Sequence, residues 1–171
     1  MGNYRIYVDG SAIGNINVTA DTPAGWGLVV VSIGDEDLHS SEPLHSKGRM
    51  VEEHYGKVVT KADHPKFIGA EVGSNNTGEL SAMYWALSII QDNNDTNDVF
   101  TIYGDSMYAG KMASREWRAK ENVSLVRKVA ELWDTLEREG HNFSWLHVKA
   151  HSGHKWNDRA DHLASIAANG E

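Results

Sequence analysis

The segment WGLVVVSI, residues 26–33, is the strongest constraint on the fold of this chain. It is short and almost entirely apolar, which is typical of a strand buried on both faces of a sheet. Such a strand requires covering layers on either side. With 171 residues, of which 40% are hydrophobic, the chain is large enough for one core of this kind. We therefore predict a single domain, residues 1–171.

The remaining apolar patterns predict helices around a sheet. Asn76 is a favourable N-cap for the clearest helix, and Glu79, three residues later, can close a capping box. Further strands are expected over residues 4–10, 50–60, 99–105 and 143–150, and further helices over about 106–117, 125–136 and 156–168. The stretch 34–48 has a loop-like composition. The resulting order predicts an α/β fold, a five-stranded mixed β-sheet flanked by α-helices.

Composition narrows the possible functions. The net charge of −8 argues against coating by nucleic acid through bulk electrostatics, although a local basic groove remains compatible with it. The absence of cysteine excludes disulfides and thiolate chemistry, so any metal must be bound by carboxylates or histidines. No signal-like or membrane-length apolar segment is found, so we expect a cytoplasmic protein with no membrane partner.

Two predicted strands end in an aspartate, namely Asp9 in YVDGS and Asp105 in IYGDS. Ligands bind at the carboxyl ends of strands in open α/β sheets, so these two side chains are expected to lie together there. Glu79 is expected in the first turn of its helix, where a carboxylate favours the helix dipole. Taken singly, each aspartate is most simply a turn residue, and Glu79 a cap.

The motifs D-G-S, N-N-T-G-E-L, Y-G-D-S, H-S-G-H and N-D-R-A-D-H-L-A occur in this order along the chain. Together they closely resemble the type 1 ribonuclease H family over essentially the whole sequence. The resemblance implies a ribonuclease H-like fold. It also implies a catalytic set, which comprises Asp9, Glu79, Asp105, Asp161 and the histidine His151.

The implied activity is hydrolysis of the RNA strand of RNA·DNA hybrids by a metal-dependent endonuclease, leaving 5′-phosphate and 3′-hydroxyl ends. Two Mg²⁺ ions roughly 3.5–4 Å apart can serve both the attacking and the leaving oxygen. Mg²⁺ prefers hard oxygen ligands, and Mn²⁺ is a possible substitute. Four clustered carboxylates would repel one another without a cation. His151 is expected to move protons or to help product release, whereas His154 is expected to be a structural loop residue.

By the same resemblance, Asn15, Asn75 and Asn76 contact the 2′-hydroxyls that distinguish RNA from DNA. The alternative for these residues is turn and cap chemistry. Two family positions that often carry Gln and Arg are Met107 and Thr77 here, which removes polar substrate contacts. These departures affect the expected affinity for substrate rather than the chemistry.

Residues 111–128, which we term the basic ridge, reverse the acidic character of the chain. Its basic side chains are Lys111, Arg115, Arg118, Lys120, Arg127 and Lys128. Among them, Arg115, Arg118 and Lys120 are predicted to bind phosphates, and Trp117 to stack on a sugar or base. The alternative is an ordinary solvated pair of helices.

Two aspartates near the end of the chain compete for the metal. If a helix begins near Trp156, successive residues turn by roughly 100°. The residues that then share its packed face are Trp156, Ala160, Leu163, Ala164 and Ala167. Asp158 lies opposite this face and should point to solvent, as should His162, whereas Asp161 lies on its flank and can lean toward Asp9.

Two rival functions remain open. One is a ribonuclease H-like DNA nuclease, such as a resolvase or integrase core. The other is a catalytically inactive nucleic-acid-binding domain of the same fold, although retention of four mutually repelling carboxylates argues against it. No obligatory protein partner is evident, and we expect a monomer that binds an RNA·DNA hybrid duplex.

Overall fold

The computed structural model describes residues 2–149 and 154–170. Its strands are β1 (Asn3–Ala12), β2 (Ala24–Ser32), β3 (Arg49–Lys57), β4 (Val99–Gly104) and β5 (Asn142–His147). Its helices are α1 (Asp35–Leu38), the 3-10 helix η1 (Leu44–Ser46), α2 (Asn75–Asp92), α3 (Met107–Ala113), α4 (Val123–Arg138) and α5 (Lys155–Ala168).

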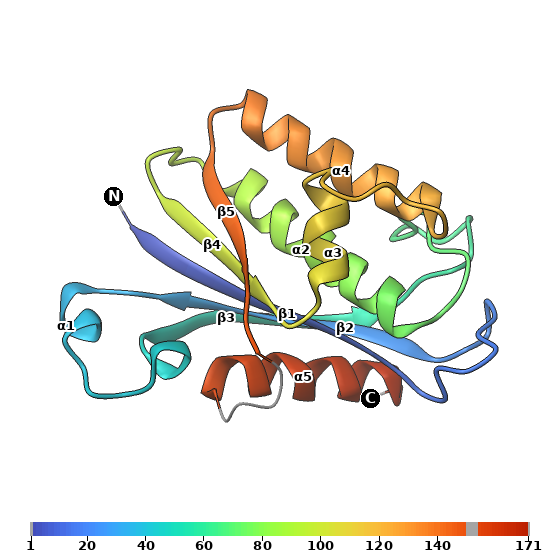
Figure 1. Ribbon diagram of the computed structural model, residues 1–171, viewed down its shortest axis with the longest axis horizontal. Coiled ribbons are helices and arrows are strands. Elements are labelled where there is room, and N and C mark those ends of the chain that lie inside the picture. The colour runs from blue at the N-terminus through green and yellow to red at the C-terminus, as the bar shows by residue number, and fades with distance from the viewer. Residues whose placement is uncertain (1, 150–153, 171) are drawn as a thin grey trace.

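The five strands form one mixed sheet in the order β3-β2-β1-β4-β5 (Figure 1). The β1–β2 and β2–β3 pairs are antiparallel, whereas β1–β4 and β4–β5 are parallel. The parallel register of β1 and β4 ends at the pair Val8 and Gly104. The next residues along the two strands are Asp9 and Asp105, so the register brings these two carboxylates to the same point of the sheet.

Helices cover both faces of the sheet, as the apolar segment 26–33 requires. Figure 1 shows α2, α3 and α4 on one face and α5 on the other, where η1 lies against α5. Every residue of β2 except the last is buried. The α5 face is tightly packed, because a Cβ atom at Gly27 would lie only 2.7 Å from the backbone of Ala160 and Ala164.

The start of α2 differs from the prediction. Ser74, rather than Asn76, is the N-cap, and its Oγ accepts a hydrogen bond from the Thr77 backbone N–H at 3.0 Å. The Thr77 hydroxyl completes a reciprocal capping box, so Glu79 takes no part in capping. Glu79 is consequently in the second turn of α2, not the first.

Other element boundaries also differ, and β3 ends at Lys57 rather than at residue 60. Helix α3 ends at Ala113 and does not extend to Trp117, because Arg115 has a left-handed backbone with φ of 66°. The stretch 34–48 contains α1 and η1, which are too short to give a periodic pattern. Strand β5 ends at His147. None of the helices described is long and apolar enough to cross a membrane.

Candidate active site

Asp9, Glu79 and Asp105 converge at the point where the parallel pairing of β1 and β4 ends. One carboxylate oxygen from each lies within 4.8 Å of the others, which is ligand spacing for a metal ion. Glu79 reaches this point from α2 because two glycines allow the helix to approach β1. A Cβ atom on Gly10 would collide with the backbone of Gly78 and Glu79. The chain thus assembles three carboxylates that lie far apart in sequence.

This cluster is buried, with exposed fractions of only 3% for Asp9 and 7% for Glu79. Burial raises the pKa of Asp9 to about 8, and the nearby Asp105 and Asp161 carboxylates add to the rise. Burial also raises the pKa of Glu79 well above its ordinary value, and the adjacent Asp9 contributes to that increase. Without a cation, these side chains retain protons because they cannot all be charged.

The donor set fits a hard divalent cation. The Asp9 carboxylate accepts a hydrogen bond from the Gly10 backbone N–H at 2.9 Å. The second carboxylate oxygen of Glu79, Oε2, is buried without a hydrogen-bond partner. A buried, unsatisfied carboxylate oxygen costs free energy unless a proton or a cation is bound to it. All three ligand side chains offer oxygen, which Mg²⁺, Mn²⁺ and Ca²⁺ prefer.

Asp161 approaches the cluster from α5. Its carboxylate contributes to the raised pKa of Asp9, although it is not among the three groups within 4.8 Å of one another. The face comprising Trp156, Ala160, Leu163, Ala164 and Ala167 is buried, as the helical phase predicted. Asp158 and His162 are exposed and Asp161 is half-buried, so the orientation of α5 brings Asp161 toward the carboxylates and keeps Asp158 away from them.

Of the two histidines in the H-S-G-H motif, only His154 lies within the described residues. The predicted catalytic residue His151 lies outside the described residues, 2–149 and 154–170. His154 is the N-cap residue of α5, and its side chain makes no capping hydrogen bond. Its ring lies edge-on to that of His45, with centroids 5.0 Å apart. His154 therefore packs in the fold, in keeping with a structural role.

The three asparagines predicted to contact substrate are exposed at the start of α2 and in the β1–β2 loop. The Asn15 side chain accepts a hydrogen bond from the Asn75 backbone N–H through Oδ1 at 3.0 Å. This bond ties the β1–β2 loop to the N-terminal end of α2, where Asn75 and Asn76 are the first two helical residues. Asn15 Oδ1 thus accepts a hydrogen bond from within the protein, and the Nδ2 amide group of the same side chain can still donate one to another molecule.

The basic ridge is partly neutralised by its own neighbours. Arg115 donates two hydrogen bonds to Asp134 Oδ2, at 2.8 and 3.1 Å, and Lys111 pairs with Glu116 at 3.0 Å. Arg118 and Lys120 are exposed, and no described residue forms an ion pair with them. Trp117 is 47% exposed. The geometry therefore favours Arg118, Lys120 and Trp117 over Arg115 as substrate contacts.

One polar residue near the site escaped the sequence analysis. Asn157 is only 2% exposed, and its Oδ1 has no hydrogen-bond partner among the described residues. It lies one helical turn before Asp161 on α5, so both side chains emerge on the same side of the helix. The spacing of four residues in N-D-R-A-D was the available signal.

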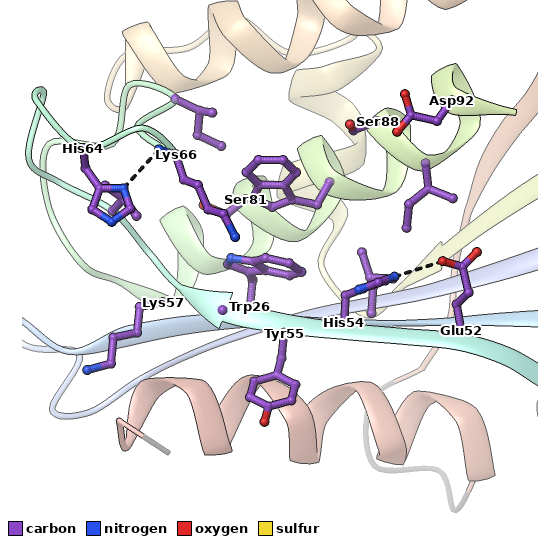
Figure 2. Close-up of a pocket in the computed structure, with 16 residues that line it drawn as sticks. Trp26, Glu52, His54, Tyr55, Lys57, His64, Lys66, Ser81, Ser88 and Asp92 are labelled. Carbon is purple, nitrogen blue, oxygen red and sulfur yellow. Dashed lines mark hydrogen bonds and ion pairs between the residues drawn. The ribbon is translucent and has the colours of Figure 1, made fainter.

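A cavity lies elsewhere, between β2, β3, α2 and the loop that joins β3 to α2. It has a volume of about 520 Å³, and Trp26 and Trp85 stack beside it with ring centroids 5.9 Å apart (Figure 2). None of the predicted site residues lines it. The carboxylates instead lie near the carboxyl ends of the two interior strands β1 and β4, away from this cavity.

Comparison with known proteins agrees with this geometry. A family model described as RNase H matches residues 1–169. Ribonuclease H of Ruthia magnifica subsp. Calyptogena magnifica is 32% identical, and the match covers 98% of this chain and 96% of the relative. Ribonuclease H of Cupriavidus metallidurans is 30% identical, and the match covers 96% of this chain and 94% of the relative.

Solved structures share the architecture. Ribonuclease H1 from the halophilic archaeon Halobacterium salinarum has a TM-score of 0.65 and 25% identity, covering 99% of this chain and 100% of its own. LC11-ribonuclease H1, solved in complex with an RNA/DNA hybrid, has a TM-score of 0.65 and 20% identity, covering 97% of this chain and 96% of its own. At this identity, the likeness shows only that the two proteins share a fold. The match along nearly the whole sequence shows that this chain belongs to the ribonuclease H family.

Proposed function

We propose that this protein is a metal-dependent endonuclease that hydrolyses the RNA strand of RNA·DNA hybrids and leaves 5′-phosphate and 3′-hydroxyl ends. The observation that supports this most directly is the convergence of Asp9, Glu79 and Asp105 within 4.8 Å. The convergence occurs in a member of the ribonuclease H family, with Asp161 close enough to raise the pKa of Asp9.

Asp9, Glu79, Asp105 and Asp161 are proposed to hold two Mg²⁺ ions once substrate is bound, with Mn²⁺ as a possible substitute. When bound, such ions activate the attacking water and stabilise the leaving 3′ oxygen. Asp9 and Glu79 are fixed by burial, so they set the geometry of the site. Asp105 and Asp161 are half-buried and therefore more exposed, and we propose that they face the incoming phosphate.

Selection of RNA is assigned to Asn15, Asn75 and Asn76, which are exposed, the last two at the start of the helix that bears Glu79. Their amide groups can bond 2′-hydroxyls across a wide minor groove. The bond from Asn75 N–H to Asn15 Oδ1 holds the two segments in a fixed relation. LC11-ribonuclease H1, which shares the fold, was solved with an RNA/DNA hybrid, the class of substrate that we propose here.

Phosphate binding away from the cleavage point is assigned to the basic ridge. Arg118 and Lys120 would contact phosphates and Trp117 a sugar or base. Arg115 is expected to contribute less because Asp134 already pairs with it. His151 is proposed, from the family resemblance, to assist proton movement or product release.

The decisive experiment uses strand-labelled duplexes. RNA·DNA hybrid, RNA·RNA and DNA·DNA are each incubated with Mg²⁺, Mn²⁺ or EDTA, and the ends of the products are analysed. We expect cleavage of the RNA strand of the hybrid alone, only with a divalent ion, and with a 5′-phosphate on the product. Cleavage of a DNA strand would favour the resolvase-like alternative, whereas binding without cleavage would favour the inactive binding domain.

A single domain, a monomeric state and a cytoplasmic location remain predictions. The single sheet, with helices packed on both of its faces, supports one domain. Light scattering of the purified protein tests the monomer directly.

A further inference from the structure

A histidine outside the family motifs, His45, contacts residues that lie close in sequence to three of the proposed metal ligands. His45 belongs to η1, the short helix that lies against the N-terminal end of α5. Its Nδ1 is 2.9 Å from the Tyr7 hydroxyl. Its ring centroid is 4.7 Å from that of Tyr103 and 5.0 Å from that of His154. One imidazole therefore contacts three separate elements of the fold.

Each of these elements carries, or directly precedes, one of the proposed metal ligands. Tyr7 lies two residues before Asp9 on β1, and Tyr103 lies two residues before Asp105 at the end of β4. Side chains two apart along a strand share a face. Tyr7 and Tyr103 are also register partners, and their rings stack with centroids 5.1 Å apart. The third contact, His154, is the N-cap of α5 and leads into the helix that bears Asp161.

We propose that His45 is a positioning residue for the carboxylate cluster, a role that rests on the metal-dependent function proposed above. By contacting Tyr7, Tyr103 and His154 together, it fixes β1, β4 and α5 relative to one another. The distances between Asp9, Asp105 and Asp161 then depend on the imidazole. Supporting residues of this kind typically change metal affinity or activity by about 10–100-fold when they are replaced.

The position of His45 is itself fixed from both sides. The Arg5 guanidinium donates to the backbone carbonyl of Leu44 at 2.7 Å. The Ser46 hydroxyl accepts a hydrogen bond from the backbone N–H of Lys155 at 3.0 Å, and the Trp156 indole donates to the Lys47 carbonyl at 2.8 Å. The segment from Leu44 to Lys47 is therefore attached to β1 and to the first turn of α5.

The chemistry of the contact suits a neutral imidazole. Burial, helped by the nearby His154 and Arg5, lowers the pKa of His45 to about 4. Burial raises the pKa of Tyr7 to about 12, against the opposing influence of Arg5. At neutral pH the pair is thus a phenol and an uncharged ring, so their hydrogen bond introduces no charge.

The test is metal binding, measured separately from activity. Mg²⁺ and Mn²⁺ titrations by calorimetry are compared for wild type, His45→Phe, His45→Asn and Tyr7→Phe, and kcat and KM are measured with hybrid. Phe retains a ring but removes the nitrogen, whereas the Asn side chain offers an oxygen near the place of Nδ1. We expect His45→Phe and Tyr7→Phe to weaken metal binding about 10-fold and to lower kcat with KM for hybrid unchanged. His45→Asn should restore part of the loss.

Val129→Ala is the control, because Val129 is buried in α4 on the opposite face of the sheet. It should lower stability while metal affinity and kcat stay at the wild-type level. If His45→Phe leaves metal affinity unchanged, or if Val129→Ala weakens it equally, the positioning role is wrong. Normal cleavage and metal binding by the wild type in that same experiment would leave the proposed function intact. A wild type that binds no metal and cuts no hybrid would overturn both.

Discussion

The Thr77 hydroxyl accepts a hydrogen bond from the Ser74 backbone N–H at 2.9 Å, and the Ser74 hydroxyl accepts one from the Thr77 backbone N–H at 3.0 Å. This reciprocal pair satisfies the start of α2 without any help from Glu79. The stability of the helix and the chemistry of its carboxylate are therefore carried by different residues, and they can be separated by mutation.

Ser74→Ala should lower the free energy of unfolding by about 1 kcal/mol through loss of the cap. It should leave most of the activity. Glu79→Gln should abolish most of the cleavage without a comparable loss of stability, because a neutral amide relieves repulsion with Asp9. Denaturant unfolding in EDTA and kcat with Mg²⁺ measure both effects. A Glu79→Gln protein as destabilised as Ser74→Ala would mean that the carboxylate supports the fold.

Asp161→Asn and Asp158→Asn form a matched pair on the same helix. Asp161→Asn should lower kcat by at least about 100-fold, beyond the effect usual for residues that only support a ligand. Asp158 is exposed, so Asp158→Asn should remain near wild type. In EDTA, Asp161→Asn should melt at the wild-type temperature or above it, since it removes a like charge from Asp9. Reversal of the two activities would contradict the orientation of α5.

The raised pKa of Asp9, about 8 against an ordinary value of 3.8, predicts a pH dependence of stability. Between these two values the folded protein keeps a proton that the unfolded chain has released, so metal-free stability should fall as the pH rises. The slope from one such proton approaches about 1.4 kcal/mol per pH unit. Mg²⁺ displaces protons, so its affinity should increase over the same range.

His45 should act in the opposite direction in the same titration. Its folded pKa is lowered to about 4, so protons bound by the unfolded chain weaken the fold as the pH drops below about 6.5.

Comparison of wild type with Asp9→Asn isolates the contribution of the Asp9 carboxylate to the pH dependence of stability. Unfolding in EDTA at several pH values between about 5 and 8.5 provides the measurement. Parallel curves for the two proteins would show that Asp9 has no raised pKa.

The basic ridge should affect binding, and its residues should not contribute equally. Arg118→Ala combined with Lys120→Ala should raise KM for hybrid and reduce the salt slope of binding by about 1 for each phosphate that the variant no longer binds. Arg115→Ala should change KM less, because its guanidinium is paired with Asp134. KM measured over a series of salt concentrations tests this order. A larger effect from Arg115 would show that its ion pair opens when substrate binds.

The sequence allowed the order of strands and helices to be predicted because their apolar periodicity is strong. WGLVVVSI could only be an interior strand, and the packed face of α5 followed from helical spacing alone. The N-cap of α2 was misplaced because Ser74 and Asn76 are both good caps, and only the hydrogen bonds distinguish them. The end of α3 was missed because the left-handed backbone of Arg115 is rare for a residue of that type.

The site was predictable only as far as its motifs extend. Asp9, Glu79, Asp105 and Asp161 were chosen by motif, and the structure adds their distances and burial. The pairing of Arg115 with Asp134 joins residues 19 apart in sequence, and that of Arg159 with Glu53 joins residues 106 apart. Contacts of this range leave no local pattern. His45 is the clearest case, since nothing near it in sequence indicates that it lies beside Tyr7.

The α5 face of the sheet has consequences for biosynthesis. Tyr7, Val29 and Val31 form a buried cluster there with Trp156 and Leu163, which are synthesised more than 100 residues later. Until they emerge, a nascent chain presents a bare apolar sheet, which is a target for chaperones and a hazard for aggregation. Asp161 also joins the carboxylates only when this helix docks. A nascent chain should therefore be unable to cleave an RNA·DNA hybrid until α5 has been synthesised and has docked on the sheet.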